Sequence, residues 1–453
     1  MHGPSAKGSG PAWTSRFAFL MASIGFAVGL GNIWRFPYVT GENGGGAFVL
    51  VYLLCVFAIG VPILIAELLI GRRGKMSPPN SMREVAIESG GRKEWQFVGL
   101  MNLLAAFLIM VTYCVVAGWV LEYLFKALVT GFSGVDGEMA IQTFDNMLGD
   151  ARGMLFWTLL SLVLTGSIIY AGVQDGIERA VKVLMPALFS LMITLVIYNM
   201  VVGGFGEAIQ YMFFADFSKI TGTVMLAAIG QAFFSIGVAM GGMMTFGAYL
   251  PKTISIPRSV VIIIVADTLV ALMAGLVIFP AVFNNGLDPA GGPGLIFKIL
   301  PVAFAQMPGG HVVSVLFFLL LSVAAITSMV GLTEPLTHWL EEHQGFSRHK
   351  STLLVLGSIA VLSVISILGY NYLAAFNLGG KDINGVVDYF SNQILLPIGG
   401  LLIAIFAGWF VDRHVSVEEL DMEDNTLFKL WYLLIRFVVP PAVFVVFVLG
   451  VSS

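Results

Sequence analysis

The chain has 453 residues, of which 58% are hydrophobic and 11% charged, and its formal net charge is −4. Soluble domains average about 45–50% apolar and about 25% charged residues, so this composition predicts an all-α integral membrane protein. The negative net charge argues against a nucleic-acid partner. The 6 histidines show no ligand spacing and no catalytic Ser/His/Asp motif is present, so we expect no enzymatic activity.

Eleven apolar segments are long enough to cross a bilayer, since a helical span needs about 20 mostly apolar residues. In chain order they cover residues 17–38, 46–71, 95–127, 154–172, 177–203, 222–249, 258–284, 311–340, 351–370, 385–410 and 429–450. The only cysteines, Cys55 and Cys114, lie in apolar segments, where we expect small buried side chains without a disulfide or metal role.

The charges of the loops predict the orientation of these spans. The loop 72–94 is rich in arginine and lysine, whereas the loop 128–153 is mainly acidic. Since Lys and Arg collect on the cytoplasmic side, we expect a multi-pass protein of the inner (plasma) membrane with a cytoplasmic N-terminus. The loops 204–221 and 285–310 then lie outside, either as a folded lid or as ordinary connectors.

The first span contains an interruption. Gly25, Gly29 and Gly31 occur within about a turn and a half, and Asn32 and Arg35 follow at once. Glycines and a polar amide at this depth favour a helix that opens there. Its free carbonyls can hold cations and its free amides can hold a carboxylate. Close packing of helices through small residues is the alternative.

The sixth span has a similar interruption over residues 230–242, where glycines and small polar residues break an apolar run. Spans one and six are the first members of two five-span halves. Matching breaks in two halves are typical of an inverted-repeat transporter whose site lies at the bilayer midplane.

Three further spans carry polar groups that fit an ion site. Ala324, Thr327 and Ser328 share one helix face and offer hard oxygen ligands suited to sodium, although Ser/Thr bonding within the helix is an alternative. Asp267 in span seven marks an ion or proton path. For Glu67 in span two we prefer a scaffold role, accepting from amides that a broken helix frees.

Four segments carry a resemblance to a known family: residues 25–37, 42–48, 230–234 and 324–328. Through them the chain resembles the neurotransmitter:sodium symporters, whose bacterial members carry amino acids on the LeuT fold. The resemblance implies eleven transmembrane helices in a 5+5 inverted repeat with broken helices one and six. The expected divisions are a cytoplasmic tail (1–12), a first repeat (13–203), an outer loop (204–221), a second repeat (222–410) and an additional helix eleven (411–453).

The resemblance also implies the residues of the site. The first sodium would be bound by Ala27, Asn32, Ser235 and Asp267. The second would be bound by Gly25, Val28, Ala324, Thr327 and Ser328. The substrate would contact Phe26, Ala27, Gly29, Leu30, Gly31, Ile109, Tyr113, Phe234, Ser235, Gly237, Met240, Ser328 and Leu332. The outer gate would be Arg35 with Asp388, and the inner gate Trp13, Ser15, Arg16, Tyr249 and Glu342. Unwinding of helix five would depend on Gly176 and Pro186.

These residues predict a sodium-coupled symporter that uses two sodium ions and imports hydrophobic L-amino acids, from aliphatic to aromatic. Because Gly29 supplies no carboxylate, the anion beside the first sodium has to arrive with the substrate. Asp267 stands where many relatives have an amide, so we expect no need for chloride, and proton antiport through Asp267 stays open. A tyrosine-selective symporter and a non-transporting sodium-dependent sensor are the alternatives. We expect a monomer in the bilayer to suffice.

Overall fold

The computed structural model describes residues 12–290, 292–422 and 425–452. Apart from one isolated bridge between Leu378 and Lys381, every regular element within these ranges is helical. The expected cytoplasmic tail, 1–12, lies outside the described residues except for Ala12. The prediction of an all-α fold is therefore confirmed.

Nine helices in the described ranges are long and apolar enough to span a membrane, and a bent helix pair makes a tenth. The bent pair is α1 (Arg16–Ala27) with η1 (Gly31–Arg35) and α2 (Phe36–Glu42). The others are α3 (Gly46–Cys55) with η2 (Val56–Gly60) and α4 (Val61–Gly74); η3 (Lys93–Trp95) with α6 (Gln96–Val129); α8 (Ala151–Tyr170); η4 (Val173–Glu178) with α9 (Arg179–Val202); α13 (Ile256–Asn284); α15 (Gly310–Gln344); α16 (Arg348–Gly369); α17 (Ile383–Asp388) with η8 (Tyr389–Leu395), α18 (Leu396–Ile405) and η9 (Phe406–Phe410); and α20 (Thr426–Leu433) with η10 (Leu434–Val438) and α21 (Val439–Ser452). 

The predicted sixth span corresponds to two shorter helices, α11 (Gly222–Ile236) and α12 (Gly242–Ala248). Neither is long enough alone to cross a bilayer of about 30 Å, because a helix rises about 1.5 Å per residue. Both lie within the predicted segment 222–249, so the eleven predicted spans all have helical counterparts in the described chain.

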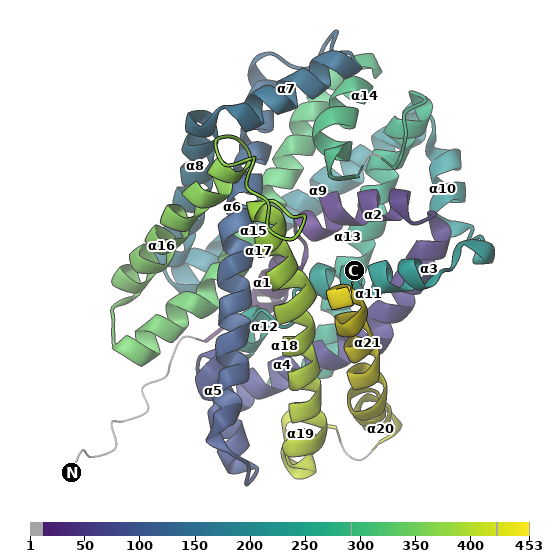
Figure 1. Ribbon diagram of the computed structural model, residues 1–453. Helices are drawn as coiled ribbons and strands as arrows, with labels where there is room; N and C mark the ends of the chain where they lie inside the picture. The colour runs from purple at the N-terminus through teal and green to yellow at the C-terminus, as the bar shows by residue number, and fades with distance from the viewer. Residues whose placement is uncertain (1–11, 291, 423–424, 453) are drawn as a thin grey trace.

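The connecting loops contain short helices that gather at the two ends of the bundle. At one end, which we call the α7/α14 end, lie α7 (Gly137–Gly149) and α14 (Leu300–Gln306), while α5 (Pro78–Glu88) and α19 (Arg413–Leu420) lie at the opposite, α5/α19 end (Figure 1). The remaining short helices are α10 (Phe205–Phe213), η5 (Phe217–Lys219), η6 (Gly292–Gly294) and η7 (Leu295–Ile299). The loops 204–221 and 285–310 thus contain folded helices.

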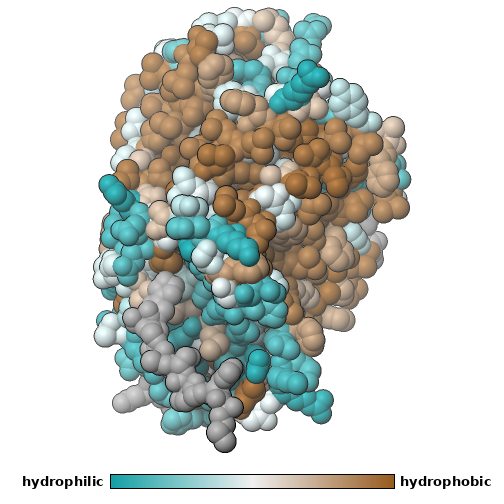
Figure 2. All heavy atoms as spheres, turned by 90° about the vertical axis from the view of Figure 1, so that its left-hand side faces the viewer, coloured by the Kyte–Doolittle hydropathy of each residue, from teal (hydrophilic) through white to brown (hydrophobic). Residues whose placement is uncertain are grey.

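The sides of the bundle are apolar. Figure 2 shows a broad hydrophobic surface between more hydrophilic margins. Apolar residues of α8, α9 and α16 are exposed, such as Val163 at 66%, Val183 at 66% and Val361 at 69%. Large apolar side chains held outward match a lipid environment, whereas the polar side chains described below are turned into the interior.

Candidate substrate and sodium site

The first span is interrupted where the glycines predict it. Helix α1 ends at Ala27, and Val28 has the extended dihedral angles φ −74° and ψ 97°. The chain becomes helical again at Gly31, and the two halves are bent by 48°. The prediction of an opened helix one is confirmed. Some carbonyls at the break, those of Gly25, Phe26 and Val28, face a side chain of another helix.

The sixth span is interrupted in the corresponding place. Helix α11 ends at Ile236, and the chain passes through the left-handed region at Gly237, φ 71°, and Gly241, φ 75°, before α12 begins. Glycine favours these angles because it has no Cβ. A Cβ on Gly237 would also lie 3.2 Å from the ring of Phe26, so the break in span six lies next to a residue close to the break in span one. The prediction of a second opened helix is confirmed.

A buried glutamate supports the second break. Ala239 adopts a positive φ of 62°, which is costly for a residue other than glycine. Its N–H donates to Oε1 of Glu67 at 2.6 Å, and the Glu67 side chain is fully buried in α4. The expected scaffold role of Glu67, accepting from an amide that the broken helix frees, is confirmed.

Polar side chains from four spans meet beside the first break. The Asn32 amide donates to Oδ1 of Asp267 at 2.8 Å and to Oγ of Ser235 at 2.9 Å, and Ser235 donates to Oδ2 of Asp267 at 2.8 Å. The Tyr52 hydroxyl lies 3.0 Å from Ser235 Oγ. All four side chains are fully buried. Carboxylate, amide and hydroxyl oxygens are the ligands that hard cations prefer, and a buried carboxylate favours a positive partner.

A second group of oxygens joins α15 to the same break. The Ser328 hydroxyl lies 3.4 Å from the carbonyl oxygen of Gly25, 3.2 Å from that of Phe26 and 3.5 Å from that of Val28. The Thr327 hydroxyl lies 3.1 Å from the Ala324 carbonyl. The five residues predicted for the second sodium are thus neighbours in space. The Ser328 hydroxyl faces carbonyls at the break, whereas the Thr327 hydroxyl bonds to the Val323 and Ala324 carbonyls of its own helix.

The main chain after the break faces a tyrosine. The N–H of Leu30 donates to the Tyr113 hydroxyl at 3.1 Å, and the carbonyl of Gly31 accepts from the Gln231 amide at 2.8 Å. A Cβ on Gly29 would lie 2.3 Å from Ser328 Oγ and 2.9 Å from the Tyr113 hydroxyl oxygen. At Gly29 the main chain therefore lies directly against the hydroxyls of Ser328 and Tyr113, with no side chain between them. This arrangement fits the expected carboxylate-binding segment.

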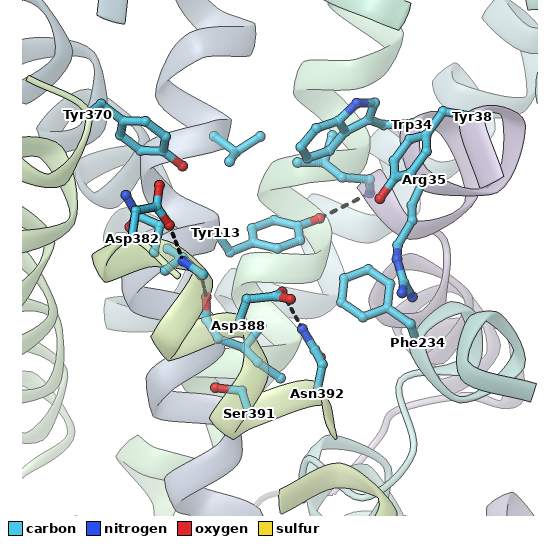
Figure 3. Close-up of a pocket in the computed structure, with 16 residues that line it drawn as sticks. Trp34, Arg35, Tyr38, Tyr113, Phe234, Tyr370, Asp382, Asp388, Ser391 and Asn392 are labelled. Carbon is cyan, nitrogen blue, oxygen red and sulfur yellow. Dashed lines mark hydrogen bonds between the residues drawn. The ribbon is translucent and has the colours of Figure 1, made fainter. Parts of the chain in front are cut away.

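A cavity of about 390 Å³ lies next to this segment (Figure 3). Four predicted substrate residues line it: Leu30, Ile109, Tyr113 and Phe234. The other predicted pocket side chains, Phe26, Met240 and Leu332, are buried. These three do not line the cavity, whose lining combines apolar side chains with polar ones such as Asp382 and Asn392.

The two predicted outer-gate residues line the same cavity without forming an ion pair. The Arg35 guanidinium stacks over Phe234, 4.8 Å from the ring centre, while Asp388 accepts from Asn392 at 2.6 Å. Figure 3 shows Arg35 beside Phe234 and Asp388 on a separate helix. Arg35 thus contacts the ring of a predicted substrate residue.

At the α5/α19 end, a second cavity of about 660 Å³ includes Tyr249 and Glu342 in its lining. Trp13 anchors the N-terminal segment there, since its indole N–H donates to the Phe246 carbonyl at 2.9 Å. Of the other predicted inner-gate residues, Ser15 caps α1 and Arg16 is exposed.

Tyr249 and Glu342 both bond to residues outside the predicted inner gate. The Tyr249 hydroxyl donates to Oε1 of Glu334 at 2.7 Å, and Glu334 forms an ion pair with Arg348. Glu342 instead accepts from the Ser77 N–H at 2.8 Å. Sequence reasoning missed Glu334, although a carboxylate inside an apolar span is itself a signal.

Helix five begins with the predicted weak points. Gly176 lies in the π-helical turn η4, where a Cβ would be 2.0 Å from the Ile168 carbonyl, and Pro186 lies inside α9. Between them, Glu178 accepts from the Thr14 N–H at 2.7 Å and from the Thr14 hydroxyl at 2.6 Å. Sequence reasoning missed Glu178, because its partner is 164 residues away in the chain.

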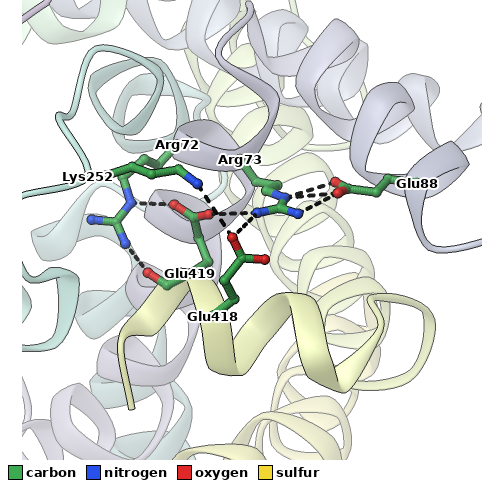
Figure 4. Close-up of polar contacts among 6 residues, drawn as sticks. All are labelled: Arg72, Arg73, Glu88, Lys252, Glu418 and Glu419. Atoms are coloured by element: carbon green, nitrogen blue, oxygen red, sulfur yellow. Dashed lines mark hydrogen bonds and ion pairs between the residues drawn. The ribbon is translucent and has the colours of Figure 1, made fainter. Parts of the chain in front are cut away.

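The basic loop after span two contains a charge cluster that the sequence indicated only as a topology signal (Figure 4). Arg72, which is buried, donates to Glu419 Oε1 at 2.5 Å and to the Ile254 carbonyl at 2.6 Å. Arg73 pairs with Glu88 and Glu418, and its hydrogen bonds lower the pKa of both carboxyls. The cluster joins α4, α5, the segment before α13, and α19.

Comparison with known proteins gives a consistent result. A family model described as "Sodium:neurotransmitter symporter family" matches residues 10–143 and 137–453. An uncharacterized sodium-dependent transporter of Haemophilus influenzae is 35% identical over 96% of this chain and 97% of its own length. The uncharacterized sodium-dependent transporter YhdH of Bacillus subtilis is 34% identical over 97% of this chain and 98% of its own. The crystal structure of MhsT in complex with L-phenylalanine superposes with a TM-score of 0.91 at 40% identity, covering 97% of this chain and all of that one.

Proposed function

Since the chain belongs to the sodium:neurotransmitter symporter family and is similar to bacterial sodium-dependent transporters, we propose that it imports hydrophobic L-amino acids, from aliphatic to aromatic, together with two sodium ions. The observation that carries this proposal is the pair of opened helices with Asp267, Asn32 and Ser235 between them. Fold membership alone would not specify a substrate.

The first sodium would sit among the carbonyl of Ala27 and the side chains of Asn32, Ser235 and Asp267. The buried Asp267 carboxylate supplies one negative charge, and the carboxylate of the amino acid would supply a second ligand on the substrate side. Sodium and substrate would then each complete the site of the other. Coupling follows, because either would bind weakly alone.

The second sodium would occupy the group of oxygens around Ser328. Its proposed ligands are the carbonyls of Gly25, Val28 and Ala324 with the hydroxyls of Thr327 and Ser328. A sodium there would tie the opened first helix to α15, so its release would loosen that contact. We place the release step at helix five, where Gly176 and Pro186 weaken the helix that borders Gly25 through Met185.

The substrate class follows from charge and shape. Gly29 supplies no side-chain carboxylate at the first sodium, so an amine without a carboxyl group would leave that cation short of a ligand. The Leu30 and Gly31 amides and the Tyr113 hydroxyl suit a carboxylate, and the carbonyls of Ala27, Phe234 and Ser235 suit an ammonium group. Phe26, Ile109, Phe234, Met240 and Leu332, with Gly237, would enclose an apolar side chain, and flexible methionine tolerates several sizes. MhsT was crystallised with L-phenylalanine, which supports this class.

Two sodium ions give ample driving force for concentration. One charge moving through 100 mV releases about 2.3 kcal/mol, and a tenfold concentration gradient adds about 1.4 kcal/mol. Two ions therefore supply about 7.4 kcal/mol, which corresponds to an accumulation of roughly 10⁵-fold for a neutral zwitterion. Alternating access would proceed between an outer gate at Arg35, Phe234 and Asp388 and an inner gate around Trp13 and Tyr249.

We place the protein in the inner (plasma) membrane with the α5/α19 end in the cytoplasm, as the basic loop 72–94 favours. Residues 13–203 and 222–410 would form the two inverted repeats, and 411–453 would carry the additional eleventh helix. A monomer would suffice, because both ion sites and the substrate pocket are built from one chain.

The decisive experiment is uptake of labelled tryptophan and leucine into proteoliposomes with imposed sodium and voltage gradients. We expect sodium-dependent accumulation of both, and inhibition by aliphatic and aromatic L-amino acids in a competition panel. Inhibition by tyrosine alone would replace the broad specificity with a tyrosine-selective symporter. Binding without uptake or counterflow would instead indicate a sensor.

Chloride independence is tested in the same vesicles. Replacing chloride by gluconate should leave uptake unchanged, because the Asp267 carboxylate already balances the charge of the first sodium. In D267N the carboxylate is lost, so we expect uptake in gluconate to fall by about tenfold and to recover in part with chloride. A severalfold loss in the unsubstituted protein on removing chloride would contradict this part of the proposal.

A further inference from the structure

The ring of Phe26 lies in a slot between two helices, and glycines form its walls. Phe26 is the second-last residue of α1 and is only 4% exposed. A Cβ on Gly331 of α15 would lie 2.2 Å from this ring, and a Cβ on Gly242, the first residue of α12, would lie 2.3 Å from it. Carbon atoms in contact are about 3.5–4.0 Å apart, so neither position has room for a side chain while the ring is there.

The other sides of the slot are filled less tightly. Phe246 contacts the ring of Phe26 edge-on, with ring centres 6.0 Å apart, and Phe246 in turn contacts Trp13. On a further side lies Gly237, whose Cβ would be 3.2 Å from the ring. Gly237 belongs to the opened part of span six, which borders the proposed substrate pocket. A ring pushed out of the slot by an added methyl group would therefore move toward this pocket.

Gly331 lies on the face of α15 that carries two proposed substrate residues. Ser328 precedes it by three residues and Leu332 follows it directly, so the three positions share one side of the helix. This side meets the first break, because the Ser328 hydroxyl lies 3.2 Å from the Phe26 carbonyl oxygen. At position 331 the face has no side chain, and the Phe26 ring occupies the space that one would fill.

The slot keeps the ring away from the space that a ligand can enter. The cavity of about 390 Å³ is lined by Leu30 and Phe234 but not by Phe26. An aromatic ring is one of the largest apolar groups in a protein, so its position decides how much room remains between the two opened spans. A change in pocket depth by one methylene group alters the affinity for a hydrophobic ligand by about tenfold or more.

We propose that Gly331, together with Gly242, is a positioning residue that sets the upper size limit of the substrate. The two glycines let the Phe26 ring withdraw against the main chain of α12 and α15, which leaves room for large aromatic side chains as well as small aliphatic ones. Phe26 itself would contact the substrate, and the glycines act through it. This inference rests on the proposed function and names the residues that determine its substrate range.

The test measures sodium-dependent binding of labelled leucine to the full chain in dodecyl maltoside, with unlabelled valine and tryptophan as competitors. In G331A the methyl group pushes the Phe26 ring toward the pocket. We expect the affinity for tryptophan to fall by about tenfold or more, and the affinity for the smaller valine to change by less than about threefold.

A second substitution separates this effect from a general disturbance of α15. In F26L the ring is replaced by a smaller side chain, which leaves room for a methyl group at position 331. Adding G331A to F26L should therefore lower the tryptophan affinity by less than about threefold. The same loss from G331A in both backgrounds would mean that the methyl group does not act through Phe26, and it would overturn the proposal.

G357A is the control, because it makes the same substitution in α16, where a methyl group meets no atom within 4 Å. Its ratio of tryptophan to valine affinity should equal that of the wild type. If G331A does not fold, G242A decides, since its methyl group meets the same ring from α12. An unchanged ratio in the folded variant, or equal losses for both competitors, would overturn the proposal. A wild-type chain that binds no leucine would instead contradict the proposed function.

Discussion

At the scale of single residues, Gly29 has the most restricted surroundings of the site. A methyl group there would lie 2.3 Å from Ser328 Oγ and 2.9 Å from the Tyr113 hydroxyl oxygen, two atoms assigned to the second sodium and to the substrate carboxylate. We expect G29A to weaken sodium-dependent amino-acid binding by about tenfold or more, because overpacking forces both hydroxyls to move. Scintillation-proximity binding of labelled leucine measures the loss.

G357A is the control for G29A, because it makes the same substitution in α16, where a methyl group meets no atom within 4 Å. It should bind leucine like the wild type. Normal binding by G29A would mean that the hydroxyls of Ser328 and Tyr113 are not where the ligands bind.

Residues of the site differ in how far the sequence could predict them. Asn32, Asp267 and Glu67 were recognisable, because a polar group inside an apolar span is costly and so carries meaning. Glu334 gives the same signal and was overlooked beside Glu342. Glu178 could not be paired with Thr14, because a contact over 164 residues depends on how helix five packs against the N-terminal segment.

At the scale of elements, Glu178 connects the N-terminal segment to the start of helix five. Both of its oxygens accept from Thr14, and the side chain is almost fully buried. In E178Q one oxygen becomes an NH₂ group that faces a donor, so the charge-assisted bonds weaken. We expect amide hydrogen exchange in residues 13–19 and 173–186 to accelerate by about tenfold, which corresponds to the loss of about 1.4 kcal/mol.

K182Q controls for the loss of charge alone, since Lys182 lies 3.1 Å from Glu178 but its side chain is 41% exposed. Exchange should change by less than about twofold there. Unchanged exchange in E178Q would mean that the N-terminal segment is held by Trp13 and not by Glu178.

The pair of Arg72 and Glu419 holds α19 against the end of α4. Their side chains are 3% and 1% exposed, and Arg72 also donates to the main-chain carbonyl of Glu419. Removing one partner leaves a buried charge, which costs about 3–5 kcal/mol. We therefore expect R72Q to lower the Tm of the detergent-solubilised protein by several degrees, whereas R72Q with E419Q should recover part of the loss.

R83Q is the control for this prediction, because Arg83 lies in the same loop but is 47% exposed and 3.9 Å from Glu84. Its Tm should stay within about one degree of the wild type. A Tm of R72Q equal to that of R83Q would show that the buried pair does not contribute to stability.

The elements themselves were largely predictable, since length and hydropathy indicate spans and clustered glycines indicate their breaks. The short helices of the loops were not, because residues 204–221 and 285–310 carry no strong periodicity. The role of α19 also escaped prediction. Its residues Glu418 and Glu419 pair with Arg73 and Arg72, which are far away in the sequence, so the sequence alone does not indicate these ion pairs (Figure 4).

At the scale of the whole molecule, the two proposed ion sites imply a definite charge movement. A zwitterion that enters with two sodium ions carries two positive charges inward, whereas return of one proton through Asp267 would leave a net movement of one. With the sodium gradient held constant, the equilibrium accumulation of leucine should therefore rise about hundredfold for each additional 60 mV in the first case and about tenfold in the second.

Potassium gradients with valinomycin set the voltage across proteoliposomes, and labelled leucine reports the accumulation. We expect the hundredfold dependence on voltage at alkaline pH, because the Asp267 carboxylate of the empty carrier then holds no proton to return. A pH-sensitive dye inside the vesicles separates the two cases, because only proton antiport raises the pH of the lumen as leucine enters. If the accumulation of leucine does not depend on voltage, the oxygens around Asp267 and Ser328 do not hold two transported cations. The site would then bind fewer transported ions than proposed.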